Sequence, residues 1–319
     1  MQRNSLNKPD YNGVVNVYKE SGFTSHDVVA VIRGIYGQKR VGHTGTLDPM
    51  AEGVLPVCLG TATKLSEMLT GSSKSYVAKM KLGIRTTTDD TTGEVIKSSD
   101  SAVNEFFSRS SSEIEAEVLK VFQKYTGKLT QLPPAYSAIK VNGKKLYEYA
   151  RAGEEVPVKP REIEVFSLEL HGIDPDEKEI QFRVECSKGT YVRSLIRDMG
   201  ESFGTEATMS YLLRDRVQAF EVKDAYKLDD LRAMKESGEL IKSVSGIREC
   251  FPDAPVACVK EAGYKYLENG NRLEEQDFES ADINMLRSVE FFIVTYGGEV
   301  QALYKFDPDK NDYKVLKKL

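Results

Sequence analysis

Residues 40–60 read RVGHTGTLDPMAEGVLPVCLG and hold four glycines and two prolines in 21 positions. This composition predicts an irregular backbone of fixed shape, and loops on a rigid scaffold commonly carry catalytic groups. Asp48 stands directly before Pro49, which keeps Asp48 away from the helical region of backbone space. By itself this carboxylate fits two descriptions. It is either a nucleophile or base, or a turn residue that accepts hydrogen bonds from its own backbone.

The glycines of this segment do not form a known phosphate-binding motif. Gly42 and Gly45 lack the Gly-Lys-Ser/Thr ending of a P-loop and the G-x-G-x-x-G spacing of a dinucleotide fold. Four cysteines and three histidines are scattered along the chain, and no two cysteines form a C-x-x-C pair. Since a zinc site needs clustered ligands, the sequence predicts neither a metal nor a nucleotide cofactor.

Outward from this segment, strand and helix patterns alternate irregularly. One helix is predicted from the Thr24 cap to Gly37, and another begins near Thr63. Further helices are predicted over residues 113–125, 146–151, 192–203 and 228–236. The predicted strands cover residues 13–18, 76–82, 162–170, 179–186 and 208–220. Residues 86–112 are rich in Thr, Ser and Asp and predict an exposed loop or an insertion. Because regular β-α-β alternation is absent, we expect an α/β (α+β) fold with a mixed, mainly antiparallel sheet and flanking helices.

Two domains are predicted for the 319 residues. Residues 251–255 read FPDAP, where two prolines accompany a switch to a more acidic composition. We therefore expect one domain over residues 1–251 and a small β-rich domain over residues 252–319.

Charge is unevenly distributed around a net value of −5. Residues 124–161 carry eight Lys and Arg against three Glu, whereas residues 251–319 carry nine against thirteen Asp and Glu. The basic stretch fits either a solvated loop or a nucleic-acid face. The polar start of the sequence and the lack of a long apolar run predict a cytoplasmic protein without a signal peptide or membrane span.

Two further segments carry chemistry. Residues 186–198 read CSKGTYVRSLIRD, a turn that leads into a helix with Arg193 near its start. Because a cation opposes the helix dipole there, Arg193 is either an ordinary surface arginine or the bidentate partner of a buried carboxylate. Residues 131–151 interleave basic and aromatic side chains, a mixture that suits RNA, although Tyr147 and Tyr149 equally fit a core.

Together and in this order, these segments resemble the TruB-type bacterial tRNA pseudouridine synthases. The motif from Gly42 to Gly60 carries most of the resemblance, and SKSY at residues 73–76, residues 131–151 and KGTYVR at residues 188–193 match further blocks. The resemblance covers residues 13–220, and the chain from 252 onward resembles the PUA-type RNA-binding domain. It implies the pseudouridine synthase fold and an enzyme that isomerises uridine 55 in the T loop of tRNA to pseudouridine, without cofactor or metal. The buried uridine must first be flipped into a pocket.

The resemblance also implies roles for single residues. Asp48 would be the nucleophile, at either the sugar C1′ or the uracil C6, and Arg193 would pair with it. Tyr76 would stack on the flipped uracil and assist proton removal. The other implied roles are a replacement for the lost base stack (His43), the pocket wall (Tyr191, Leu212) and contacts with RNA phosphate (Lys19, Lys64). Many relatives carry Pro after Lys19, whereas Glu20 follows here, which leaves the pose of Lys19 open.

Two alternatives stay open. One is a non-catalytic RNA-binding or tRNA-folding protein on the same scaffold, against which the intact Asp48, Tyr76 and Arg193 argue. The other is the catalytic subunit of a guide-RNA ribonucleoprotein, against which the lack of long lysine-rich tails argues. We expect a monomer that binds the T-arm stem-loop of tRNA and requires no protein partner.

Overall fold

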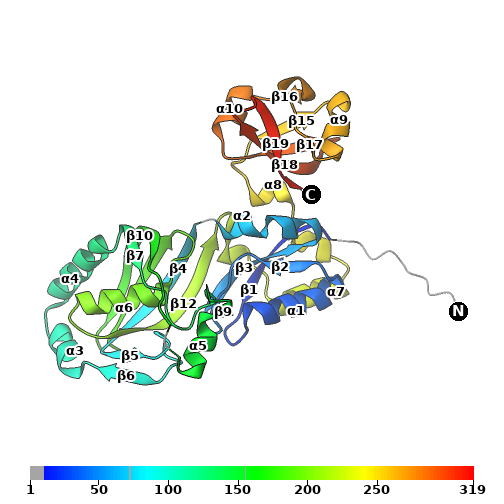
Figure 1. Cartoon of the computed structure of the whole chain (residues 1–319). Helices are drawn as coiled ribbons and strands as arrows, with labels where there is room; N and C mark the ends of the chain where they lie inside the picture. Colours follow the sequence, from blue (N-terminus) through cyan, green and yellow to red (C-terminus); the bar gives the residue numbers. More distant parts are fainter. Residues whose placement is uncertain (1–10, 72, 155) are drawn as a thin grey trace.

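A computed structural model describes residues 11–71, 73–154 and 156–319 (Figure 1). A large sheet crosses the first part of the chain. In spatial order its strands are β14 (Val244–Ser245), β1 (Gly13–Lys19), β3 (Glu52–Leu59), β12 (Ala207–Val217), β4 (Lys74–Leu82), β11 (Glu179–Cys186), β10 (Arg161–Asp174) and β7 (Gly127–Gln131), with β2 (Val41–His43) on β3 and β13 (Phe220–Glu221) on β12.

The pairing within this sheet is antiparallel except between β3 and β12, which run parallel in its middle. There Leu213 lies opposite Glu52, and Arg214 lies opposite Gly53. The expected mixed, mainly antiparallel sheet with flanking helices is confirmed.

Helices pack against the large sheet in two groups (Figure 1). α1 (Ser25–Tyr36) and α7 (Leu228–Glu236) lie beside each other near β1 and β2, while α6 (Val192–Ser202) packs on β12 and β4 and α4 (Ser111–Lys124) on β10. The predicted limits of α1 are confirmed, because Thr24 and Asp27 form a capping box and Gly37 ends the helix at φ 68°. The helix expected near Thr63 is instead a 3-10 turn, η1 (Gly60–Leu65), followed by the short α2 (Ser66–Thr70).

The prediction of a loop over residues 86–112 is wrong, although most of these residues are exposed as expected. β5 (Ile84–Thr86) pairs with β6 (Val95–Ser98), and α3 (Asp100–Phe107) follows. Asp89 and Asp90, between the two strands, are 7% and 5% exposed. Their charges are buried because arginines of α6 pair with them, a relation between distant segments that local composition does not reveal.

A second sheet of five strands forms a β-rich unit near the C-terminus, as expected. Its order is β16 (Phe278–Ser280), β15 (Val256–Val259), β17 (Phe292–Tyr296), β18 (Glu299–Asp307) and β19 (Asp312–Lys318), with α9 (Glu261–Glu268) and α10 (Ile283–Ser288) beside it. No helix within the described parts of the chain is both long and apolar enough to cross a membrane.

An apolar cluster joins the two sheets next to α2 and α8 (Ile247–Cys250) (Figure 1). Val14 and Val54 of the large sheet belong to it together with Ile293 and Leu303 of the small one, and all four are 0% exposed. The small sheet is therefore packed against the large one through a shared core.

Candidate active site

The loop between β2 and β3 carries Asp48 and is tied to its surroundings by its backbone. Leu47 donates its N–H to Ser25 Oγ over 2.9 Å, and Pro49 accepts from the N–H of Gly22 over 2.9 Å. Ala51 donates back to the carbonyl of Asp48 over 3.1 Å. The side chain of Asp48 remains 34% exposed. A fixed loop thus presents a carboxylate that solvent, and hence a ligand, can reach.

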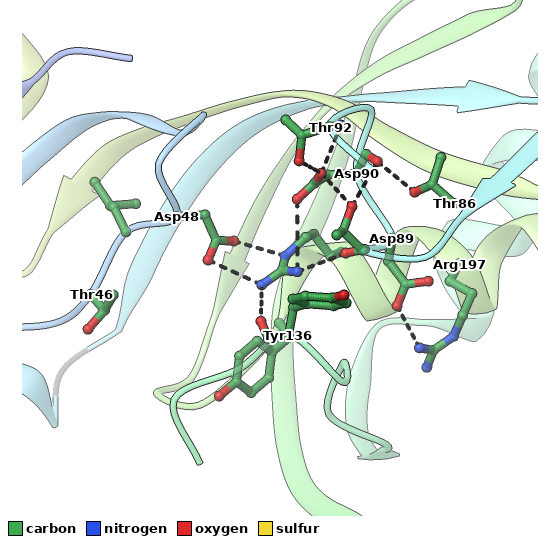
Figure 2. Close-up of polar contacts among 12 residues, drawn as sticks. Thr46, Asp48, Thr86, Asp89, Asp90, Thr92, Tyr136 and Arg197 are labelled. Carbon is green, nitrogen blue, oxygen red and sulfur yellow. Dashed lines mark hydrogen bonds and ion pairs between the residues drawn. The ribbon is translucent and has the colours of Figure 1, made fainter. Parts of the chain in front are cut away.

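Arg193, in the first turn of α6, binds this carboxylate with two nitrogens. In Figure 2 it is the unlabelled guanidinium joined by dashed lines to Asp48. Its Nε lies 2.9 Å from Asp48 Oδ2, and one terminal nitrogen donates to Asp48 Oδ1 over 3.1 Å. The Arg193 side chain is only 4% exposed. A paired fork of this kind fixes the plane of the carboxylate as well as its position.

The remaining donors of Arg193 are also occupied. They reach the carbonyl of Thr88 over 2.8 Å and that of Tyr136 over 2.9 Å, and Asp90 Oδ2 lies 3.9 Å away. Figure 2 shows Asp48 and Asp90 approaching from different sides. The guanidinium is therefore held in one orientation by three segments of the chain.

One turn further along α6, Arg197 makes a parallel set of contacts. It binds Asp89 Oδ2 over 2.9 Å (Figure 2). It also donates to the carbonyl of Leu132 over 3.3 Å. Asp89 itself has a positive φ of 58°, which is uncommon for a residue other than glycine. Asp89, Asp90 and Arg197 are site residues that the sequence analysis missed, and only the i, i+4 spacing of the two arginines could have indicated them.

The environment of Asp48 perturbs its titration. Burial raises the pKa of the Asp48 carboxyl, and the Arg193 guanidinium opposes that shift. The bidentate geometry favours the ionised form, because a neutral carboxyl group would accept the two bonds from Arg193 more weakly. We therefore describe the pair as carboxylate and guanidinium.

His43 ends β2 beside the loop. Burial, with His26 and Arg214 nearby, lowers the pKa of His43 to about 4, so the ring is neutral at physiological pH. Its Nδ1 accepts from the N–H of Gly45 over 3.2 Å, which assigns the ring proton to Nε2. His43 thus offers a flat, uncharged ring.

Tyr76, Leu212 and Tyr191 lie on the elements that surround Asp48. Tyr76 on β4 and Leu212 on β12 are 8% and 5% exposed and share an apolar cluster with Leu47. Burial raises the pKa of Tyr76 to about 12, so its phenol is protonated at neutral pH. Tyr191 is half-buried before α6, and Gln131 binds both its N–H and its carbonyl.

The two predicted phosphate-binding lysines differ in exposure. Lys19 is 0% exposed and donates to the carbonyls of Glu20, Pro49 and Ala51 over 3.2, 3.1 and 2.5 Å. Its ammonium is therefore buried under the Asp48 loop, and its contact with RNA phosphate stays a prediction. Lys64 is exposed and donates to the carbonyl of Lys318 over 2.6 Å, so its role stays a prediction.

Basic and aromatic side chains pair on the segment after Gln131. The ammonium of Lys144 lies over the ring of Tyr149, and Lys145 and Arg151 lie over that of Tyr147. Neither tyrosine is fully buried, so the core interpretation is not supported. Across residues 11–71, 73–154 and 156–319, no group of three or more His, Cys, Asp or Glu residues is arranged to hold a metal ion.

Comparison with known proteins gives one consistent result. Residues 33–192 match the model of the TruB family pseudouridylate synthase N-terminal domain. The chain is 41% identical over 313 residues to tRNA pseudouridine synthase B of Lachnoclostridium phytofermentans, with 96% of this chain and 99% of that protein covered. It is 40% identical over 306 residues to tRNA pseudouridine synthase B of Listeria welshimeri, with coverage of 94% and 95%. Among solved structures, Cbf5 in the archaeal box H/ACA sRNP Nop10-Cbf5 complex is similar, with a TM-score of 0.69, 25% identity, and coverage of 97% of this chain and 86% of that one.

Proposed function

Because this chain belongs to the TruB family of pseudouridylate synthases, we propose that it isomerises uridine 55 in the T loop of tRNA to pseudouridine. The observation that carries the proposal is the asymmetric exposure of one ion pair. The Arg193 side chain is 4% exposed, whereas the Asp48 side chain is 34% exposed. A buried cation behind an accessible carboxylate suits a nucleophile that must meet an incoming nucleotide.

The reaction needs no group beyond those of the chain and the RNA. Asp48 attacks either C1′ of the ribose, which displaces the base, or C6 of the ring, after which the C1′–N1 bond breaks. In both cases the electron pair of the C1′–N1 bond stays on uracil. The detached base then rotates, and its C5 forms the new bond to C1′ while the Asp48 carboxylate is released. The proton lost from C5 is balanced by the one gained at N1, so the result is an isomer.

The side chains around Asp48 have matching roles in this proposal. The ring of Tyr76 gives the extruded uracil a flat apolar face, and Leu212 and Tyr191 close the pocket around it. His43 fills the place that the base leaves in the RNA stack, a task that its neutral ring performs without burying a charge. Lys64 and the basic stretch 124–161 meet RNA phosphates.

We also propose that the catalytic part spans residues 1–251 and that residues 252–319 form a second RNA-binding domain. The chain would act as a monomer without an obligatory protein partner. Activity of the purified chain on a bare T-arm stem-loop, without guide RNA, tests this. A requirement for guide RNA or another protein would favour the ribonucleoprotein alternative.

The central experiment is the Asp48→Asn variant. We expect it to form no pseudouridine in a T-arm transcript, because the amide is no nucleophile, while RNA affinity stays within about threefold of wild type. Pseudouridine is measured by mass spectrometry and affinity by filter binding. Turnover at the wild-type rate would refute the assignment of Asp48. A wild-type chain that binds the transcript without modifying it would favour the non-catalytic alternative.

A further inference from the structure

Arg214 is a buried charge for which the proposed mechanism has no role. It lies on β12 opposite Gly53, at the parallel junction in the middle of the large sheet, and is 1% exposed. A guanidinium stays protonated in proteins, and burying it is costly unless its donors are satisfied. The groups that bind the Arg214 side chain therefore indicate its role.

The donors of Arg214 reach backbone carbonyls on both sides of Asp48. Nε donates to Val54 over 2.7 Å, and the two terminal nitrogens donate to Gly45 over 3.2 Å and Thr46 over 3.5 Å. Lys19 binds the carbonyls of Pro49 and Ala51 in the same loop. Two buried cations thus hold the backbone before and after the carboxylate.

The same guanidinium lies beside Tyr76. Tyr76 is directly opposite Arg214 across the antiparallel β4–β12 pair. Side chains of directly opposite residues lie next to each other on one face of a sheet. The Arg214 charge also opposes the burial that raises the pKa of Tyr76. One side chain therefore contacts the Asp48 loop and lies next to the Tyr76 side chain.

The backbone around Arg214 leaves little freedom for another arrangement. A Cβ at Gly53, where φ is +102°, would lie 2.2 Å from the carbonyl oxygen of Arg214. A Cβ at Gly45, where φ is +131°, would lie 3.8 Å from a terminal nitrogen of Arg214. The backbone of β3 at Gly53 is thus packed directly on that of Arg214, and a Cβ at Gly45 would be in ordinary van der Waals contact with the guanidinium.

We infer that Arg214 is a positioning residue of the reaction, which fixes the loop of Asp48 and the side chain of Tyr76 relative to each other. The inference rests on the proposed function. Arginine is required because its planar fork donates in several directions at once, whereas a lysine ammonium is a single point charge on a different stem. Lysine would keep the positive charge and lose the shared geometry.

The test compares Arg214→Lys with Arg216→Lys. Arg216 lies on the same strand, is 27% exposed and binds Glu185 instead of the loop. For Arg214→Lys we expect a single-turnover rate about 100-fold lower, because small misplacements of reacting groups have effects of that size. RNA affinity should stay within about twofold, and Arg216→Lys should retain the wild-type rate.

A double-mutant cycle with Tyr76→Phe separates positioning from a purely structural role. Arg214→Lys should reduce the rate by a smaller factor when the Tyr76 hydroxyl is absent. If Arg214→Lys reduces the rate by the same factor with and without the Tyr76 hydroxyl, the coupling is overturned. The coupling is also overturned if Arg214→Lys regains the wild-type rate at a lower temperature, where the variant is fully folded. If Arg214→Lys does not fold, Arg214→Gln, which keeps an amide donor, replaces it. A folded Gln variant with the wild-type rate overturns the inference.

These outcomes are distinguishable from failure of the proposed function. A wild-type chain that forms no pseudouridine would refute both the function and the inference. An active wild type with an equally active Arg214→Lys variant would refute the positioning role alone.

Discussion

Replacing Arg193 by lysine measures how much the second hydrogen bond from the guanidinium to Asp48 contributes to the reaction rate. The arginine makes two bonds to the carboxylate, of 2.9 and 3.1 Å, whereas lysine can make at most one of this strength. A hydrogen bond to a charged group contributes about 1.5–3 kcal/mol. Loss of one such bond in the transition state therefore predicts a rate reduction of about 10- to 150-fold.

Arg197→Lys is the matched control. Arg197 lies one turn further along α6, is 8% exposed and is paired with a buried aspartate, but it does not touch Asp48. Both variants should lose similar thermal stability, measured by calorimetry, because each leaves a carbonyl acceptor unpaired. Only Arg193→Lys should show the full rate loss in single-turnover assays on a T-arm transcript. Equal rate losses in the two variants would refute the direct action of Arg193 on Asp48.

Three further predictions follow from charged and titratable groups. Burial lowers the pKa of His43 to about 4 in the folded chain, compared with about 6.5 in the unfolded chain. The contribution of the neutral His43 ring to folding stability is therefore fully present above pH 6.5 and declines as the pH falls toward 4. The melting temperatures of wild type and His43→Gln should converge over that pH range. Lys19→Met should destabilise the chain by about 2–4 kcal/mol in urea unfolding, because three buried carbonyls lose their donor; an unchanged midpoint would contradict the buried position. RNA affinity should fall steeply as the salt concentration rises. The single variants Lys144→Ala and Lys145→Ala should each reduce the slope of log affinity against log salt concentration by about one. A flat salt response would place the RNA on another face.

Local signals were sufficient for the parts of the fold that depend on local chemistry. The limits of α1 follow from Thr24 and Gly37, whose preferences for helix ends do not depend on distant residues. The irregular loop around Asp48 is equally visible from its glycines and prolines. The pairing of Asp48 with Arg193, 145 positions apart, was expected only from the family resemblance.

Buried charge marks the limit of the sequence analysis. Lys19, Asp89 and Arg214 belong to residue types that are mostly exposed, and nothing in their immediate neighbours indicates otherwise. Each is buried because a partner from a distant segment satisfies it: loop carbonyls for Lys19 and Arg214, and Arg197 for Asp89. A polar segment such as residues 86–93 therefore resembles a surface loop until its arginine partners are known.

The apolar cluster shared by the two sheets has a consequence for biosynthesis. Val14 and Val54 are among the first residues to leave the ribosome, whereas Ile293 and Leu303, which cover the same cluster, emerge after most of the chain is made. Domains that fold during translation generally do so from the N-terminal end. In this chain the apolar side of the early strands stays exposed until the C-terminal strands are made. A nascent chain arrested before residue 290 should therefore bind chaperones that the completed polypeptide does not need.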